Sequence, residues 1–185
     1  MGDMLSPYRI LDLTDERSHL TGLLLAQLGA EVIAVEPPSG STSRHIGPFA
    51  QDDENIENSL THWAWNRGKK SIIGGVAEIE LLAKTSDVVL DCGVFKDLDL
   101  GNLRSANPSL LTVTVSPFGA TGPKSNWLAT DLTLLASGGQ LGFTGDPDRA
   151  PIQIGGVPQG WLHAALEAAE ATSIALFARG TSGCG

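Results

Sequence analysis

The segment Arg9–Glu36 constrains the fold of this chain more than any other. Its two ends, Arg9–Leu13 and Glu31–Glu36, are short and mainly apolar, as expected for strands that are covered on both faces. Between them, Ser18–Leu28 carries leucines at helical spacing, and Gly29 follows where a helix C-terminal cap belongs. A strand, a helix and a strand in such quick succession predict a βαβ unit with two parallel strands.

The rest of the chain repeats this alternation. Further strands and helices are expected at Asp87–Asp91, Leu110–Val115, Val76–Lys84 and Asp131–Ala136. The clearest long helix is Trp161–Arg179, with Gly180 expected as its cap, while Pro37–Ser59 is expected as a long loop. The pattern predicts the α/β class, with an open, mostly parallel sheet and helices on both faces. Ligands bind such sheets beyond the carboxyl ends of the strands.

Composition narrows the possible functions. A length of 185 residues suits one domain, and the net charge of −9 is poorly suited to binding nucleic acid. A local basic patch can still hold an anionic small molecule. The sequence has no apolar run long enough to span a membrane, and Met1–Pro7 lacks a secretory signal pattern. With only two cysteines, the chain is expected to be a cytoplasmic protein without a disulfide framework.

Several familiar nucleotide and hydrolase motifs are missing. A dinucleotide fold needs glycines directly after the first strand, but Thr14–Ser18 contains none and carries two acids. Glu36 mimics the ribose-binding acid of such folds, which is a weak signal by itself. A P-loop ending at Gly68-Lys69 fails because Trp63 and Lys70 stand where glycine and a hydroxyl residue are required. No Gly-x-Ser-x-Gly elbow is present either.

We expect no metal site. The four histidines could form a ligand pair only through long-range folding, and His45 and His62 are expected to be solvated residues in or beside the long loop. Two cysteines are too few for a structural zinc site.

Five segments, in order along the chain, share one resemblance. They are Leu11–Leu13, Leu25–Glu36, Asn66–Ile72, Ser116–Pro123 and Thr144–Asp148. Together they resemble the family III CoA-transferases, the carnitine dehydratase and bile-acid-inducible family, which includes formyl-CoA transferase and α-methylacyl-CoA racemase. The resemblance extends from residue 9 to the end of the chain. Each segment is weak alone, but their order and spacing are hard to obtain by chance.

The resemblance implies a larger protein than this chain. Residues 1–185 would be the N-terminal part of a Rossmann-like large domain, and the small domain and the C-terminal part would be absent. The chain would stop inside the expected fold. Its partners would be acyl-CoA and carboxylic acid small molecules, together with the remainder of its own chain or a homologous subunit in an interlocked dimer.

The implied chemistry is transfer of CoA between carboxylic acids through an aspartate, which attacks the thioester and forms a mixed anhydride. Aligning Ala175–Arg179 with the end of the family's long helix puts that aspartate on Trp161, and indole cannot perform this attack. Other positions also depart from the family pattern. His19-Leu20 replaces a Gly-Pro pair, and Thr130 replaces the histidine that the racemase branch needs.

Three other residues are candidates to substitute for the aspartate. His163 and Glu167 are four apart on one helical face, so they could do acid–base work, but a surface pair is the favoured interpretation. Cys92 ends a strand at the ligand-binding edge and could be a nucleophile, although a buried core cysteine is favoured. We therefore assign no catalytic residue from the sequence.

Coenzyme A or acyl-CoA is the expected substrate, and the resemblance indicates which residues would contact it. These are Arg67, Lys69, Lys70, Cys92, Gly93, Phe118 and Gly119. A lysine pair such as Lys69-Lys70 is more often solvated than ligand-binding, but lysine also binds phosphate as a point charge. The loop at Phe118 could let the backbone approach a ligand or serve as a plain strand-to-helix turn.

Three functions remain open. The first is a CoA-transferase-like domain without its own nucleophile, as the degenerate half of a duplicated protein or a divergent subunit. The second is an active acyl-CoA transferase or racemase fragment completed by the missing region. The third is a non-enzymatic module that binds CoA or a partner protein.

Overall fold

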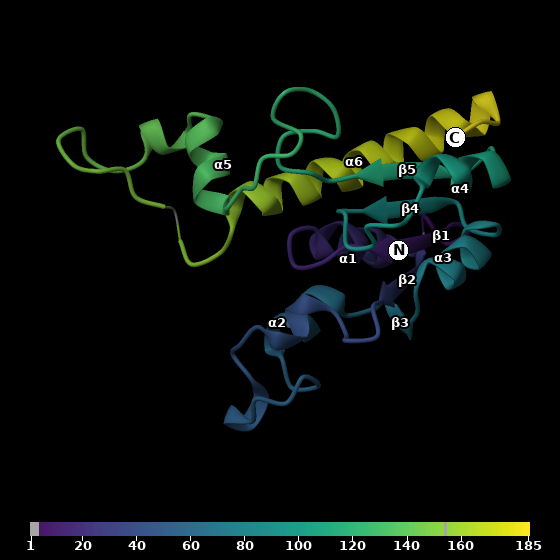
Figure 1. Ribbon diagram of the computed structural model, residues 1–185, viewed down its shortest axis with the longest axis horizontal. Coiled ribbons are helices and arrows are strands. Elements are labelled where there is room, and N and C mark those ends of the chain that lie inside the picture. The colour runs from purple at the N-terminus through teal and green to yellow at the C-terminus, as the bar shows by residue number, and fades with distance from the viewer. Residues whose placement is uncertain (1–3, 154) are drawn as a thin grey trace.

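A computed structural model describes residues 4–153 and 155–185 of the chain (Figure 1). Residues 1–3, part of the segment without a secretory signal pattern, lie outside the described residues. The strands are β1 (Arg9–Leu13), β2 (Glu31–Glu36), β3 (Lys70–Ile73), β4 (Val88–Asp91) and β5 (Leu111–Thr114). They form one sheet in the order β3-β2-β1-β4-β5, and every pairing is parallel. The predicted open parallel sheet is confirmed.

Helices cover both faces of this sheet. They are α1 (His19–Gln27), α2 (Leu60–Asn66), α3 (Val76–Ala83), α4 (Leu100–Ala106), α5 (Asp131–Ser137) and α6 (Gln159–Ser182). Short 3₁₀ turns occur at Thr42–His45, Ala50–Asp52 and Gln140–Phe143. Helices α1 and α6 pack against each other on one face, whereas α3 and α4 contribute to the core of the other. The α/β class with helices on both faces is therefore confirmed.

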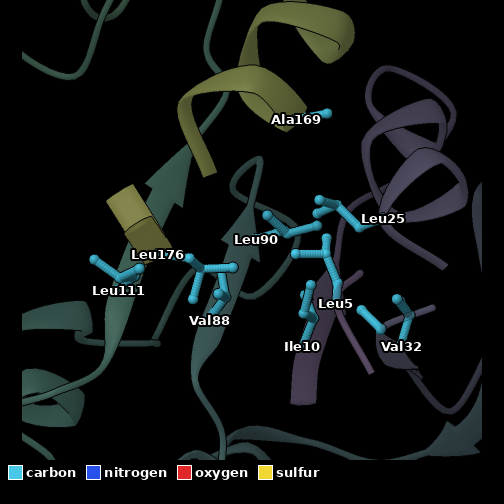
Figure 2. Packing of buried hydrophobic residues seen from close by; sticks show 10 residues of the cluster. Leu5, Ile10, Leu25, Val32, Val88, Leu90, Leu111, Ala169 and Leu176 are labelled. Atoms are coloured by element: carbon cyan, nitrogen blue, oxygen red, sulfur yellow. The ribbon is translucent and has the colours of Figure 1, made fainter. Parts of the chain in front are cut away.

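The core has two halves because successive strand residues point to opposite faces. Ile10 of β1 packs with Leu25 of α1 and Leu176 of α6, and Figure 2 shows this half of the core. The neighbouring Leu11 packs on the other face with Ile79 of α3. Both sides of each central strand are thus covered, which explains why these strands read as nearly continuous apolar runs.

The observed helix ends correct one expectation. Gly29 follows α1 with a φ of 101°, so it does serve as the expected left-handed terminator. Gly180, however, does not cap α6. The helix continues to Ser182, and Gly183, with a φ of 72°, is the cap. A glycine inside a helix weakens it without stopping it, and the contacts of α6 with α1 and β5 carry it past this position.

The loops that follow the strands gather on one side of the sheet. In Figure 1 the carboxyl ends of β4 and β5 point toward the side from which α2 and α5 project. The strand order changes direction between β1 and β4, because the chain builds outward from β1 to β3 and then returns to add β4 and β5. Ligand sites in open parallel sheets form at such a switch point.

Candidate functional site

A pocket of about 610 Å³ lies along the carboxyl-terminal halves of β1 and β2 and the first residues of β3. Its wall includes strand residues Asp12, Ala34 and Ser71, which are in register across the three strands. Helix α2 and the segment before β3 supply the opposite wall, including Trp63 and Arg67. The long loop expected at Pro37–Ser59 also contributes, so it is part of a site rather than a plain connection.

A closed ring of hydrogen-bonding side chains underlies this pocket; we call it the polar ring. Its members, each in contact with the next, are Asp12, Thr14, His19, Ser43, His62, Asn66 and Lys69. They come from β1 and the residue that follows it, α1, the long loop, α2 and the residue before β3. Since buried polar groups are stable only when paired, the ring fixes the loop and α2 onto the sheet.

An ion pair between Asp12 and Lys69 closes the polar ring. The two side chains are each 1% exposed, and Lys69 Nζ lies 2.7 Å from Asp12 Oδ2. Lys69 also donates to the carbonyl oxygen of His19 and to Asn66 Oδ1, each at 2.9 Å, so all three of its donors are used. Burial raises the pKa of the Asp12 carboxyl, but the Lys69 charge, His19 and the hydrogen bonds from Lys69 and Thr14 together outweigh burial, and the net pKa is lowered.

This geometry corrects the interpretation of Lys69 as half of a solvated pair. Lysine is almost never buried without a partner, and here the partner lies 57 residues earlier in the chain. All three donors of Lys69 are engaged inside the protein. Lys70, in contrast, is 69% exposed and pairs with Glu31 at 2.6 Å.

The two histidines of the polar ring are neutral. Burial and the Lys69 charge lower the pKa of His19 to about 4, and burial and Arg44 lower the pKa of His62. His62 Nδ1 lies 2.7 Å from Ser43 Oγ, and His19 Nε2 lies 3.0 Å from the same oxygen. The expectation that His62 is solvated is wrong, because the long loop folds over α2 and buries it.

Glu36, at the end of β2, is also fully engaged. Arg44 binds both of its carboxylate oxygens, at 2.6 and 2.8 Å, and Ser71 Oγ and the Ser41 amide donate to it as well. Burial raises the pKa of Glu36, but these donors outweigh it and lower the pKa to about 2. A carboxylate held in this way has no free oxygen for a ribose hydroxyl, which agrees with the missing dinucleotide motif.

The cations best placed to meet an anionic ligand at the pocket are Arg67 and Lys70. Both side chains line it and both are exposed. Arg67 uses Nη1 to bond the Ala64 carbonyl at 2.6 Å, which leaves other donors of its guanidinium available. The pocket lining carries four cationic and four anionic side chains, Arg44, Arg67, Lys69 and Lys70 against Asp12, Asp15, Glu36 and Glu57. It is therefore electrically balanced, in a chain whose net charge is −9.

A second cluster fills the switch point between β1 and β4. Arg17 binds Asp15 through Nε, at 2.8 and 3.0 Å, and through Nη2, at 2.6 Å, and it also bonds the carbonyl oxygen of Cys92. Burial strongly raises the pKa of the Cys92 thiol, so this residue is a buried core cysteine and is poorly suited to act as a nucleophile. Gly93 follows it with a φ of 81°.

Trp161, near the start of α6, packs against this cluster. It is 7% exposed and packs with Cys92, Val115 and Ala168. The Arg17 guanidinium carbon lies 5.8 Å from the centre of the indole ring, within the range of a cation–π contact. Asp131 Oδ1 accepts from the Trp161 amide at 3.2 Å, and Gln153 Nε2 donates to Asp131 Oδ2 at 2.9 Å.

Asp131 is the residue near this position that sequence reasoning missed. It precedes Trp161 by 30 residues, and only folding brings α5 against the start of α6. The sequence predicts a helix from Asp131, but a helix start does not indicate which other element that residue will contact.

The remaining predicted residues lie elsewhere. His163 and Glu167 are exposed on α6, as expected for a surface pair. Phe118 packs edge-to-face against Trp127 at 6.0 Å, and the Lys124 ammonium lies over both rings. Neither Phe118 nor Gly119 is among the described residues that line the pocket. The seven expected CoA contacts thus fall into separate places, and their binding role stays a prediction.

Within residues 4–153 and 155–185, no helix is long and apolar enough to cross a membrane. No cluster of three or more histidine, cysteine, aspartate or glutamate side chains in these ranges has the arrangement of a metal site.

Comparison with known proteins identifies the family. The family model described as CoA-transferase family III matches residues 5–185. A protein named succinyl-CoA:(R)-benzylsuccinate CoA-transferase subunit BbsE, from Thauera aromatica, is 32% identical over all of this chain and 48% of its own length. Succinate–glutarate CoA-transferase from Agrobacterium fabrum is 37% identical over 72% of this chain and 37% of its own length.

A solved structure agrees with these sequence matches. A CAIB/BAIF family protein from Brucella suis superposes with a TM-score of 0.87 and 30% identity, over 96% of this chain and 50% of that protein. The chain thus spans about half the length, or less, of the relatives it matches. Because the family model covers nearly the whole chain, and because the fold agrees, the chain belongs to CoA-transferase family III.

Proposed function

We propose that this chain is the CoA-binding, N-terminal part of the large domain of a family III CoA-transferase, and that it lacks its own aspartate nucleophile. One observation carries the proposal. Trp161, which aligns with that aspartate, is buried among Cys92, Val115 and Ala168. An indole has no lone pair available to attack a thioester, and an anhydride needs a carboxylate.

The proposed ligand is coenzyme A or an acyl-CoA in the 610 Å³ pocket. Its phosphate groups would meet Arg67 and Lys70, the two exposed cations of the lining. No metal is part of the proposal. The carboxylate that accepts the acyl group would come from the remainder of the protein or from a homologous subunit. The Thauera relative is by its name a subunit, which supports an assembly of this kind. We also propose that the protein is cytoplasmic.

A specific observation favours a second candidate, an active transferase that uses Asp131. Its carboxylate lies 3.2 Å from the Trp161 amide and is thus close to the position of the missing nucleophile. Both of its oxygens are already bonded, however, one to that amide and the other to Gln153. We therefore favour a role for Asp131 in holding the start of α6.

Intact-mass measurement separates the two candidates. The chain is incubated with succinyl-CoA, and the mass of the protein is followed beside the release of free CoA. We expect no covalent adduct. A succinyl adduct that is absent from Asp131→Asn would establish the second candidate, and an adduct that survives this substitution would refute both.

A further inference from the structure

We infer that this chain holds CoA without recognising the acyl group attached to it, because its own side chains fill the crevice into which an acyl group would extend. The inference rests on the proposed function, since it assumes that CoA occupies the pocket. It assigns Arg17, Asp15 and Trp161 as the residues that set this lack of acyl specificity.

The pocket ends where the switch-point crevice begins. Thr14 and Asp15, after β1, and Val94, after β4, are the lining residues closest to the switch point. Arg17, Cys92 and Trp161 lie beyond them and are not among the described residues that line the pocket. The crevice in which open parallel sheets usually bind part of their ligand is therefore occupied by the protein itself.

The Arg17–Asp15 pair forms the wall between the pocket and the crevice. Arg17 contacts both oxygens of Asp15 and is also tied to the Cys92 carbonyl at 3.0 Å, so one side chain links the segments after β1 and β4. Moving Arg17 aside would leave the carboxylate of Asp15, whose side chain is only 12% exposed, without its partner. Such uncompensated buried charges are costly, so the wall is not expected to open for a ligand.

Trp161 packs against this wall. The Arg17 guanidinium lies 5.8 Å from the centre of its ring, and the indole also packs with Cys92, Val115 and Ala168. An aromatic ring of this size, packed at the density of a protein interior, leaves no volume for an acyl chain. The cluster therefore combines a neutralised charge pair with a filled apolar space.

The arrangement also gives CoA a direction. Arg67 and Lys70 lie at the β3 side of the pocket, and Asp15 and Val94 lie at the β1/β4 side. Three strand spacings separate β3 from β4, which is about 14 Å across the sheet. With its phosphates at the cations, a CoA molecule would point its thiol end toward the wall. Bulk added to the sulfur would meet the Arg17–Asp15 pair or remain in solvent.

The test is a comparison of affinities by calorimetry on the full 185-residue chain. Free CoA, acetyl-CoA and butyryl-CoA are titrated under identical salt conditions. We expect dissociation constants that agree within about twofold. A preference of about tenfold or more for any one of the three would overturn the inference while leaving CoA binding intact. Absence of heat from all three at about 1 mM would refute the proposed function itself, and this inference with it.

A variant that opens the crevice gives a second, independent test. Trp161→Ala removes the indole against which Arg17 packs, so the Arg17–Asp15 pair can shift into the vacated apolar space without separating, and two extra methylenes of butyryl-CoA can follow it. We expect butyryl-CoA to bind this variant about fivefold or more tightly than acetyl-CoA. Phe177→Ala, which removes an aromatic ring that is 84% exposed on the same helix, is the matched control and should bind acetyl-CoA and butyryl-CoA with equal affinity.

Folding of both variants is checked by thermal melting before the titrations. If Trp161→Ala is folded and still binds the two thioesters equally, Trp161 does not limit access and the inference fails. If that variant does not fold, Trp161→Leu, which removes the ring but keeps the site apolar, takes its place with the same expected preference and the same condition for failure.

Discussion

The adjacent lysines Lys69 and Lys70 each pair with a carboxylate, but the first pair is buried and the second is exposed. Lys69 is buried against Asp12, and we expect Lys69→Met to lower the free energy of unfolding by about 3–5 kcal/mol, because it leaves a buried carboxylate unpaired. Lys70 is exposed beside Glu31, so Lys70→Met should change stability by about 0–1 kcal/mol. Urea denaturation of the two variants measures the difference.

The two lysine variants also distinguish a structural role from a ligand-binding role. If CoA binds as proposed, Lys70→Met weakens binding in a protein of normal stability. Equal and small stability losses for the two variants would contradict the buried ion pair. From the sequence the two residues look alike, because the 57-residue separation between Asp12 and Lys69 hides their contact. The local sequence pattern placed both lysines in one segment that resembles the family, but it could not show which lysine is buried.

His19 makes stability depend on pH. Its pKa is lowered from 6.5 to about 4 by burial and by Lys69, so between these values the unfolded chain binds more protons than the folded one. Stability is therefore complete above about pH 6.5 and falls as the pH drops toward about 4, by about 3 kcal/mol in total. His62, whose pKa is also lowered, acts in the same direction.

Urea denaturation at several pH values between about 6.5 and 5 isolates this effect, because the buried carboxylates Asp12 and Glu36, whose pKa values are lowered, lose their contribution only at more acidic pH. His19→Gln should flatten the dependence, whereas the exposed His163→Gln should leave it unchanged. A wild-type stability that does not vary over this range would show that His19 is not held neutral by the polar ring.

Among the elements, two glycine substitutions test where helix α6 ends. Gly180 lies within the helix, and an added Cβ would meet no atom within 4 Å, so Gly180→Ala should raise stability by about 0.5–1 kcal/mol. Gly183 has a φ of 72°, and Gly183→Ala should lower stability by about 1 kcal/mol because the left-handed conformation is strained for alanine. Thermal melts measure both, and stabilisation by both substitutions would contradict the assigned helix end.

The elements that the sequence predicted share a strong local signal. Strands β1 and β2 and helix α6 have continuous apolar runs or a long helical period, and each is confirmed. Helices α2 and α4 and strand β3 were not predicted. Their stability comes from contacts distant in sequence. Strand β3, for example, is held by pairing with β2 and presents exposed residues such as Lys70 and Ile73.

At the scale of the whole molecule, the candidate site depends on the order of the strands. The sequence predicted parallel strands and a ligand site beyond their carboxyl ends, where Cys92 was expected to lie. It could not predict that β3 lies three strands away from β4, so it grouped residues that the fold separates. The polar ring was equally hidden, because its seven members come from five separate segments.

The separation of β3 from β4 predicts which segments CoA will protect from hydrogen exchange. Hydrogen exchange with and without CoA should show slower exchange in the segments that line the pocket, residues 34–44 and 66–71. Residues 116–127, which carry Phe118 and Gly119, should be unaffected, because they do not line it. Arg67→Gln removes an exposed cation from the pocket and should abolish most of the protection, whereas Lys124→Gln, on the Phe118 loop, is the matched control. Protection confined to residues 116–127 would move the CoA site away from the pocket and favour the contacts that the family resemblance assigned to that loop.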